Sequence, residues 1–232
     1  MFTLAKKEFK DLFASPIAYV FITVFLFLVF WLFYNDFFLA NQSHMVGFFS
    51  WTSLLFIIFL PSVTMGKWSE ENRAGTQELL FTLPLKTSEL VLGKFVACAT
   101  FLLIVLLLTS PLVLTLYLLG DPDIGQIIAS YAGCFLLGCA YIALGLLVSS
   151  LTKNQIISFM LSVIVLFIFY VLGSPLVVAY VPKTIEPILQ FISLHQHFES
   201  MTRGVIDTRD LIYFFSVIGL SIYGNVLALK KI

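Results

Sequence analysis

The stretch FVACATFLLIVLLLTSPLVLTLYLLG, residues 95–120, contains no Asp, Glu, Lys or Arg. An α-helix needs about 20 apolar residues to cross the hydrocarbon core of a bilayer, so this stretch can hold one span. Comparable charge-free runs lie at residues 12–35, 37–66, 124–152, 154–182 and 211–229. Because none alternates like a β-strand, and lipid tolerates no unpaired backbone group, we expect helices rather than a barrel. The sequence predicts an all-α polytopic membrane protein with six spans, near residues 16–35, 47–66, 95–119, 126–150, 155–180 and 211–229.

The composition supports a membrane protein and disfavours several other classes. Hydrophobic residues make up 60% of the 232 and charged residues only 11%, whereas a soluble domain is about half apolar and roughly a quarter charged. Lys plus Arg and Asp plus Glu both number 13, so there is no basic excess of the kind that indicates nucleic-acid binding. A soluble enzyme, a disordered tail and a nucleic-acid-binding protein are therefore all disfavoured.

The basic residues predict the orientation of the chain. If the N-terminus is cytoplasmic, only Lys183, Arg203 and Arg209 fall outside and the other basic residues fall inside, as the positive-inside rule requires. The first apolar run is too long for the apolar region of a signal peptide, so we expect it to remain as a span. We therefore expect one transmembrane domain over residues 1–232, with both termini and loop 67–94 in the cytoplasm and loop 182–210 outside.

The expected spans carry no charged side chain, which argues against several mechanisms. Proton relays and ion-coupled sites place ionisable groups at membrane depth. Gly93-Lys94 lacks the spacing of a phosphate-binding loop, and neither a catalytic triad nor an HExxH pattern occurs. Cys98, Cys134 and Cys139 lack metal-ligand spacing. We expect no catalytic residue, metal or cofactor in this chain, so the energy for any work would come from a partner.

Loop 67–94 has the pattern of an amphipathic helix over residues 69–83. One apolar face recurs at helical spacing, formed by Thr76, Leu79, Leu80 and Leu83. A second, polar face is formed by Glu71, Gly75 and Glu78. Pro84 ends this helix, because the residue before a proline avoids the α region. We expect the helix either to lie along the membrane surface with its polar face toward the cytoplasm or to be an ordinary solvated connection.

Two motifs resemble a known family of permeases. The loop reads Glu70-Glu71-x-Arg73-x-Gly75-Thr76-x-Glu78-Leu79-Leu80-x-x-Leu83-Pro84, then Ser88-Glu89-x-x-x-Gly93-Lys94. This resembles the loop between spans two and three of ABC-2-type permeases, the membrane subunits of ATP-binding-cassette transporters. The outside segment reads His197-Phe198-Glu199-Ser200-Met201-x-Arg203-Gly204-Val205-Ile206-Asp207. It is similar to one branch of that family, which includes gliding-motility-associated permeases and the permease of the nitrous-oxide-reductase maturation system.

The resemblance implies a type V exporter-like permease fold in the inner membrane of a bacterial cell, with residues 1–15 as a cytoplasmic elbow helix. Two permeases, as a homodimer or as a heterodimer with a related chain, would pair in membrane lipid above two separate ABC ATPase subunits that hold ATP and Mg. In that family the helix after span two is a coupling helix that docks in the ATPase. The residues implied at this interface are Glu70, Glu71, Arg73, Gly75, Thr76, Glu78, Lys6 and Lys7. The implied function is ATP-driven transport, with export as the expected direction.

Other residues have candidate structural roles. Small residues that would pack helices closely or line a pathway lie in the fourth span, at Gly138, Gly145 and Ser149. Prolines 61, 111 and 175 are expected to kink spans two, three and five. Short helices are expected near residues 185–192 and 196–203 of the external loop, whose candidate residues are His197, Phe198, Arg203 and Asp207. We expect Arg203-Gly204 to end a helix, Asp207 to cap span six, and the histidines to pack in the loop rather than bind metal.

Two other functions are compatible with the sequence. The first is a non-transporting scaffold, related to the same permeases, that couples ATP hydrolysis to assembly or force transfer in the cell envelope, as in gliding machinery. The second is a polytopic membrane enzyme, which the lack of a catalytic set disfavours. The sequence does not indicate a substrate.

Overall fold

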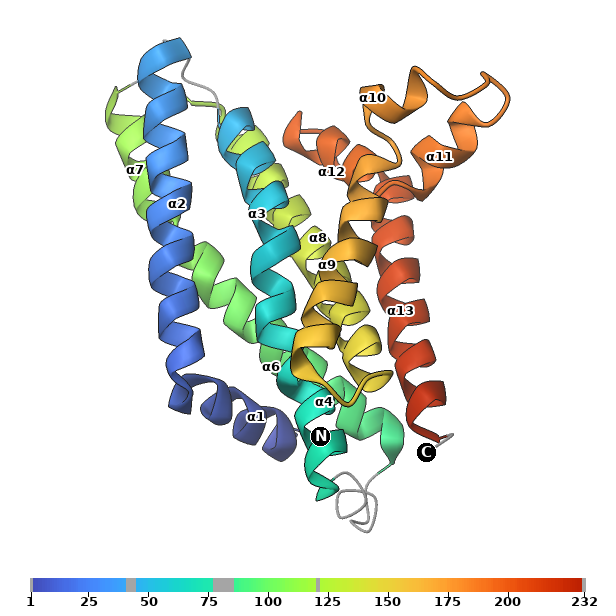
Figure 1. Ribbon diagram of the computed structural model, residues 1–232. Coiled ribbons are helices and arrows are strands. Elements are labelled where there is room, and N and C mark those ends of the chain that lie inside the picture. Colours follow the sequence, from blue (N-terminus) through green and yellow to red (C-terminus); the bar gives the residue numbers. More distant parts are fainter. Residues whose placement is uncertain (1, 41–44, 77–85, 120–121, 231–232) are drawn as a thin grey trace.

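A computed structural model describes residues 2–40, 45–76, 86–119 and 122–230, and the regular elements in these ranges are α-helices. Long helices form a bundle with short helices at both ends (Figure 1). They are α1 (Phe2–Ala14), α2 (Pro16–Ala40), α3 (Val46–Thr64), α4 (Gly66–Ala74), α6 (Thr87–Leu107), α7 (Ser110–Leu119), α8 (Ile124–Ser150), α9 (Gln155–Val171), α10 (Pro175–Val178), α11 (Glu186–Ile192), α12 (Leu194–Thr202) and α13 (Thr208–Lys230). The start of α1 and the end of α13 lie at the same end of the bundle.

Within the described ranges, five helical segments are long and apolar enough to cross a membrane. They are Pro16–Asn35, Val46–Ala74, Thr87–Leu118, Ile124–Ser150 and Thr208–Lys230. The helix α9 is apolar too, but its 17 residues fall short of a full span. The all-helical membrane fold predicted from the sequence is confirmed, with five long spans and one shorter helix at the six predicted places.

The fifth predicted span, residues 155–180, is wrong in its extent, because α9 ends at Val171. The chain bends at Gly173, where an added Cβ would lie 2.5 Å from the Cβ of Ser193. Pro175 then begins the short helix α10. Proline lacks an N–H and cannot continue the hydrogen-bond ladder of the preceding helix. The close contact between Gly173 and Ser193 and the proline at position 175 together explain why α9 ends before residue 180.

The third predicted span also differs in its bounds. It is divided into α6 and α7 by a break at residues 108–109, just before Pro111. The helix α6 begins at Thr87, where the carboxylate of Glu89 accepts the backbone N–H of Lys86 at 3.1 Å. Such a contact satisfies a donor at a helix start. Because α6 begins this early, Lys94 lies inside a span helix, and the expectation that all charges lie off the spans is wrong for this residue.

The predicted loop helix over residues 69–83 is wrong in its bounds. The helix α4 runs from Gly66 to Ala74 and ends at Gly75, which has a φ of 69°. This left-handed conformation is accessible to glycine at little cost and commonly ends helices. Of the predicted faces, Glu71, Gly75 and Thr76 are described, whereas Glu78, Leu79, Leu80 and Leu83 lie outside the described residues.

The helix α8 lies in the middle of the bundle and packs against α3, α6, α9 and α13. An added Cβ at Gly138 would lie 2.4 Å from the Cδ2 of Leu102 in α6. An added Cβ at Gly145 would lie 2.4 Å from the Oγ1 of Thr64 in α3. A side chain at either position would push a neighbouring helix away, so both glycines allow the close approach that small residues give to membrane helices.

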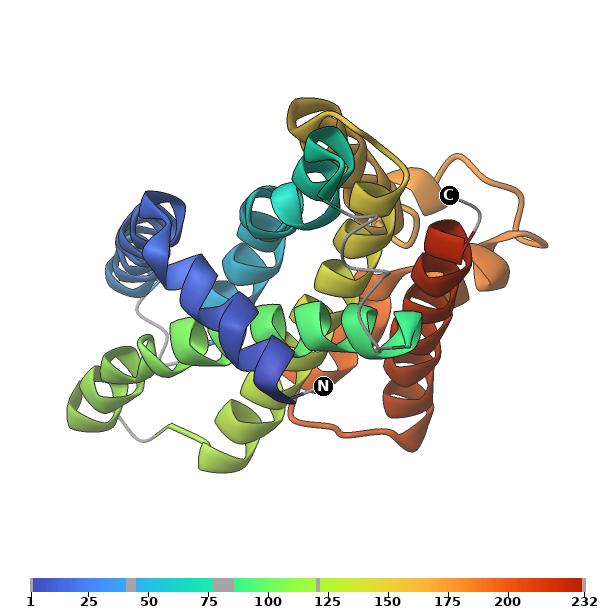
Figure 2. The ribbon, with the colours of Figure 1, turned by 90° about the horizontal axis from the view of Figure 1, so that it is seen from below.

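The helix α1 lies across the foot of the bundle rather than along it. Seen from below, it runs diagonally past the first turns of α6 (Figure 2). The two helices are close, because an added Cβ at Gly93 would lie 2.8 Å from the Cδ2 of Leu4. Ala5, Glu8 and Leu12 form the buried face of α1, whereas Lys6 and Lys7 are exposed. This placement brings the N-terminal segment against α6, next to α4.

Candidate functional site

Four charged side chains meet where α1, α4 and α6 converge, and we call them the ionic junction: Glu8, Lys67, Glu71 and Lys94. The Nζ of Lys94 donates to the Oε1 of Glu8 at 2.9 Å and to the Oε1 of Glu71 at 2.6 Å. The Nζ of Lys67 donates to the Oε2 of Glu8 at 3.0 Å. Two carboxylates and two ammonium groups thus balance one another, and Lys94 links three helices at once.

The ionic junction is buried, with Lys94 at its centre. Only 2% of the Lys94 side chain is exposed. Its Nζ also lies 4.8 Å from the ring centroid of Trp68, which is itself fully buried. A buried ammonium needs charged or aromatic partners, because desolvation otherwise costs several kcal/mol. Burial alone would raise the pKa of Glu8, but the ammonium groups of Lys94 and Lys67 hold the pKa of this carboxyl below its usual range.

The helix α4 is also fixed to α8, by hydrogen bonds to Ser149. The Oγ of Ser149 accepts the backbone N–H groups of Trp68 at 3.2 Å and Ser69 at 3.3 Å. The same hydroxyl donates to the carbonyl of Met65 at 2.8 Å. One donor and two acceptor positions are all that a hydroxyl offers, so the side chain is fully used. Ser149 therefore holds the kink between α3 and α4 in place.

The residues that the resemblance implies at an ATPase interface fall into two groups. Glu70, Arg73, Gly75 and Thr76 are exposed on α4 and at its end, and Lys6 and Lys7 are exposed on α1. Glu71 instead points inward, because its carboxylate is bonded to Lys94. Glu78 lies outside the described residues. The exposed group is available to a partner, whereas Glu71 belongs to the ionic junction.

Sequence reasoning missed most of the ionic junction. Glu8 lies within the expected elbow helix, residues 1–15, and Lys67 and Lys94 lie at the two ends of the expected loop 67–94, so nothing in the sequence pairs them. Two signals were present in the sequence: Lys67 and Glu71 are four apart, which places them on one face of a helix. Lys94 directly adjoins a long apolar run, where a helix that starts early would bury it.

The opposite end of the bundle carries the predicted external residues, and we call α11, α12 and the start of α13 the loop cap. Phe198 is 1% exposed. The Nδ1 of His197 lies 2.7 Å from the Oδ1 of Asp210, and its Nε2 lies 3.0 Å from the carbonyl of Phe191. Arg203 pairs with Glu199 on the surface at 2.6 Å. The side chains of the loop cap thus pair with one another.

The ends of the loop-cap helices match the sequence patterns. The helix α12 ends beside Gly204, whose φ is 87°. Asp207 accepts the backbone N–H of Arg209 at 2.9 Å, at the start of α13. Within the described residues, no group of three or more His, Cys, Asp or Glu could hold a metal ion.

The arrangement at the ionic junction is suited to mechanical linkage. It joins three helices through charge-assisted hydrogen bonds next to an exposed polar helix. The model of the family described as ABC-2 family transporter protein matches residues 2–228. No curated protein sequence matches the chain. With nearly its whole length matched, the chain belongs to the ABC-2 family of transporter proteins.

Proposed function

We propose that the chain is the permease subunit of an ATP-driven ABC transporter that exports a substrate across the inner membrane of a bacterial cell. It would pair with a second permease and bind two ATPase subunits at the end of the bundle that carries α1 and α4. That end would face the cytoplasm. Membership of the ABC-2 family supports an ABC ATPase as partner. The external motif, His197 to Asp207, further leads us to place the chain in the gliding-motility and nitrous-oxide-reductase-maturation branch.

The observation that carries this proposal is the three-way contact of Lys94. If an ATPase moves α4, the bond between Lys94 and Glu71 must either break or draw α6 along. The bond between Lys94 and Glu8 adds α1 to the same unit. Rigid-body movement of linked helices is a known way to pass a change from one site to another. We therefore propose that the ionic junction passes motion of α4 to α1 and α6.

The docking surface would be the exposed side of α4 with the turn at Gly75. Glu70, Arg73 and Thr76 are exposed there, and the helix is held from behind by Ser149. A short helix fixed on one side and polar on the other can transmit force without being pressed into the membrane. Substrate binding would take place elsewhere in the assembled permease pair.

Copurification with the ATPase tests the docking surface. We expect Arg73→Glu to weaken recovery of the ATPase by about tenfold or more, since a reversed charge at an interface costs over 1 kcal/mol. Lys230→Glu is the matched control, because Lys230 is exposed at the same end of the bundle but on α13. Equal recovery of the ATPase with both variants would show that α4 is not the docking helix.

A second measurement tests transmission through the ionic junction. We expect the triple variant Glu8→Gln, Glu71→Gln and Lys94→Met, which leaves no buried unpaired carboxylate, to keep ATPase binding while it reduces the effect of the permease on the rate of ATP turnover in vesicles. Unchanged regulation of turnover in this variant would contradict the proposed path through Lys94. A wild-type complex that hydrolyses ATP but moves no solute would favour the scaffold function instead.

A further inference from the structure

A charged hollow of about 240 Å³ lies beside the ionic junction, between α1, α3, α4 and α6. At roughly 30 Å³ per water molecule, it is large enough for a polar group of several heavy atoms. Its walls include Lys7 and Asp11 of α1, Glu70 and Glu71 of α4, and Gln155 at the start of α9. The hollow therefore lies at the level where the bundle meets the membrane surface.

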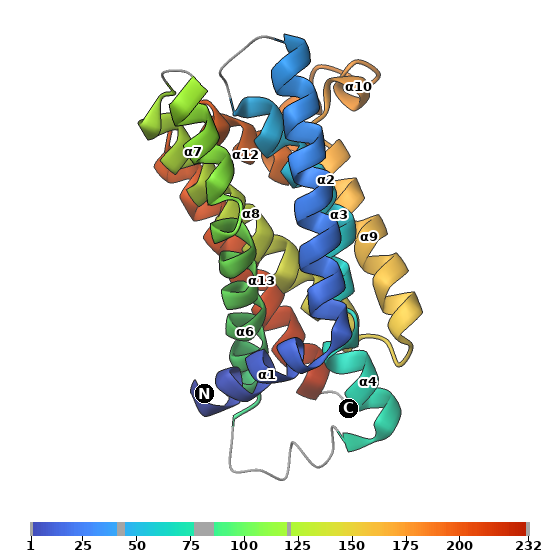
Figure 3. The same cartoon turned by 90° about the vertical axis from the view of Figure 1, so that its left-hand side faces the viewer.

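An apolar groove of about 330 Å³ continues from this hollow along the outside of α2 and α3. Both hollows are lined by Ile17 and Ser62, so they adjoin at these two residues, which we call the neck. The groove then follows α2 past Val20 to Val24 and faces Phe59 of α3. The eight helical residues from Ile17 to Val24 extend about 10 Å along the axis. Figure 3 shows α1 turning away from the foot of α2 beside α4.

The charges of the hollow are mixed, with a small acidic excess. Three of its lining residues are basic and four are acidic: Lys7, Lys67, Lys94, Glu8, Asp11, Glu70 and Glu71. The Oε2 of Glu71 is buried and has no hydrogen-bond partner among the described residues. Burial of a carboxylate oxygen without a hydrogen-bond donor costs free energy, so a bound cationic donor at this atom would be favourable. The ammonium of Lys67 has three protons, so its bond to Glu8 leaves further donors for an anion.

We propose that the hollow and groove together bind one phospholipid whose headgroup carries a primary amine. Its ammonium would donate to Glu71 and Glu70, and its phosphate would accept from Lys7 and Lys67. One acyl chain would pass the neck at Ser62 and lie along α2. The lipid comes from the leaflet on the α1–α4 side and joins α1 to α4. The site shares Glu70 and Lys7 with the proposed ATPase interface, so lipid binding is measured on the chain alone.

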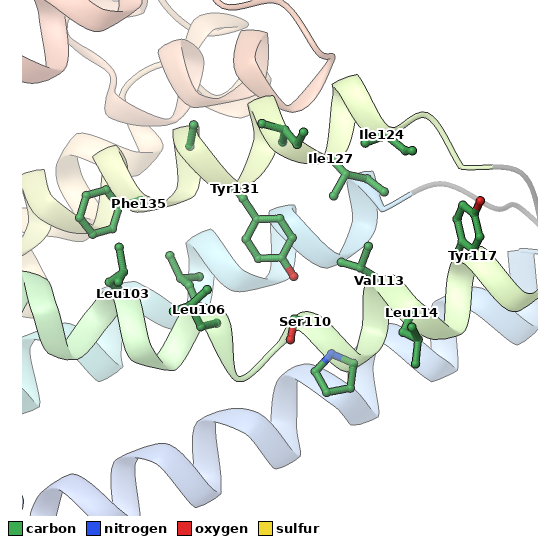
Figure 4. A pocket seen from close by; sticks show the side chains of 14 residues that line it. Leu103, Leu106, Ser110, Val113, Leu114, Tyr117, Ile124, Ile127, Tyr131 and Phe135 are labelled. Atoms are coloured by element: carbon green, nitrogen blue, oxygen red, sulfur yellow. The ribbon is translucent and has the colours of Figure 1, made fainter.

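A larger hollow elsewhere in the bundle shows why the site at α1 is selective. It has a volume of about 1000 Å³ and lies between α6, α7 and α8 (Figure 4). The lining residues that the structure describes there are uncharged, and its polar atoms include the hydroxyl of Tyr131, which is 2.8 Å from Thr109. Such a surface accepts any hydrocarbon chain, whereas the hollow at α1 offers partners for both charges of a zwitterion.

Native mass spectrometry of the delipidated full chain tests the proposal. The probes are phosphatidylethanolamine, phosphatidylcholine and phosphatidylglycerol with identical acyl chains. We expect phosphatidylethanolamine to bind at least about tenfold more tightly than the other two, the effect of one charge-assisted hydrogen bond. The choline headgroup has no N–H to donate, and the glycerol headgroup has no amine. Equal binding of the three lipids would overturn the proposal.

Four variants locate the site. Glu70→Gln should abolish most of this preference, because Glu70 faces the amine. Lys7→Gln should weaken binding of all three lipids, because all three carry the phosphate. Lys10→Gln should change neither, because Lys10 is exposed on the same helix but does not line the hollow. Ser62→Leu should block the neck and weaken binding of all lipids at this site. Because Glu70, Lys7 and Lys10 are all exposed, these variants should fold. A preference that survives Glu70→Gln, or binding that Lys7→Gln leaves unchanged, would place the lipid elsewhere and refute the site.

Discussion

The two ends of the helix bundle hold their charges in different ways. At the ionic junction, Lys94 pairs with Glu8, which lies 86 positions away in the chain, and with Glu71, 23 positions away. In the loop cap, His197 pairs with Asp210, only 13 positions away, and Arg203 pairs with Glu199 within one helix. The first end joins distant segments of the chain, whereas the second joins neighbours.

The consequence is a difference in what each end can do. Movement of α4 changes contacts with α1 and α6, because Lys94 belongs to all of them. The charged pairs of the loop cap lie within one continuous segment, residues 197–210, and α12 contacts α8 through uncharged groups such as the carbonyl of Thr202 and the amide of Gln126. A site that must pass motion between helices needs the first arrangement, and a surface that only has to stay folded can use the second.

The contacts of His197 fit this local role. Its Nδ1 faces the carboxylate of Asp210 and its Nε2 faces the carbonyl of Phe191, so both ring nitrogens lie at hydrogen-bond distance from an oxygen. The ring also stacks on Tyr213, with centroids 3.9 Å apart. These contacts hold α11, α12 and α13 together without involving the rest of the bundle.

The largest expected effect comes from removing the centre of the ionic junction. Lys94→Met leaves the carboxylates of Glu8 and Glu71 buried without their shared cation. Loss of one partner of a buried pair destabilises a protein by about 3–5 kcal/mol. Thermal and denaturant unfolding in detergent measure this loss, with Lys230→Met as the control on an exposed lysine at the same end. The triple variant that also carries Glu8→Gln and Glu71→Gln should recover part of the lost stability. If Lys94→Met were as stable as the wild type, the ion pairs of Lys94 with Glu8 and Glu71 would have no structural role.

Much of the fold could be predicted from the charge-free runs. The predicted fourth and sixth spans, residues 126–150 and 211–229, agree closely with α8 and α13. Both short helices of the external loop lie where they were expected. Long apolar runs mark where the chain enters lipid, because charges are costly there.

The ionic junction could not be predicted in the same way. Burial of Lys94 depends on Glu8 and Glu71, which come from other helices, and one sequence does not reveal which distant segments meet. The end of α4 was missed for another reason: glycine inside a periodic pattern is compatible with a helix, and nothing in the spacing shows that Gly75 takes a positive φ.

A second comparison concerns two serines of α8, one near each end of the bundle. Ser149→Ala orphans the buried N–H groups of Trp68 and Ser69, at about 1–3 kcal/mol for each unsatisfied donor. Ser130→Ala should cost less, because Ser130 only donates, to the carbonyls of Gln126 and Thr202. Unfolding of the two variants side by side measures the difference. Equal losses would show that α4 is no more tightly fixed than the loop cap.

A third comparison uses two glycines of α8. Gly145→Ala presses on Thr64, a β-branched side chain with few alternative rotamers, and overpacking of this kind costs about 1–3 kcal/mol. Gly133→Ala would bring the added Cβ to 2.8 Å from the Cβ of Met201, a smaller overlap than the 2.4 Å at Thr64, so we expect a smaller loss. Gly219→Ala is the control, since an added Cβ there has nothing within 4 Å. Greater loss at Gly133 than at Gly145 would mean that the loop cap is the more rigid end.

The smallest effect is expected from the surface pair of the loop cap. Arg203 and Glu199 lie one helical turn apart, with 70% and 41% of their side chains exposed. Water and salt screen such a pair, so Arg203→Gln should cost only about 0.3–0.5 kcal/mol and less at high ionic strength. Its N–O distance of 2.6 Å equals that between Lys94 and Glu71. The two variants therefore remove ion pairs of equal length. If Arg203→Gln lost as much stability as Lys94→Met, burial and the linkage of distant helices would not explain the difference between the two ends of the bundle.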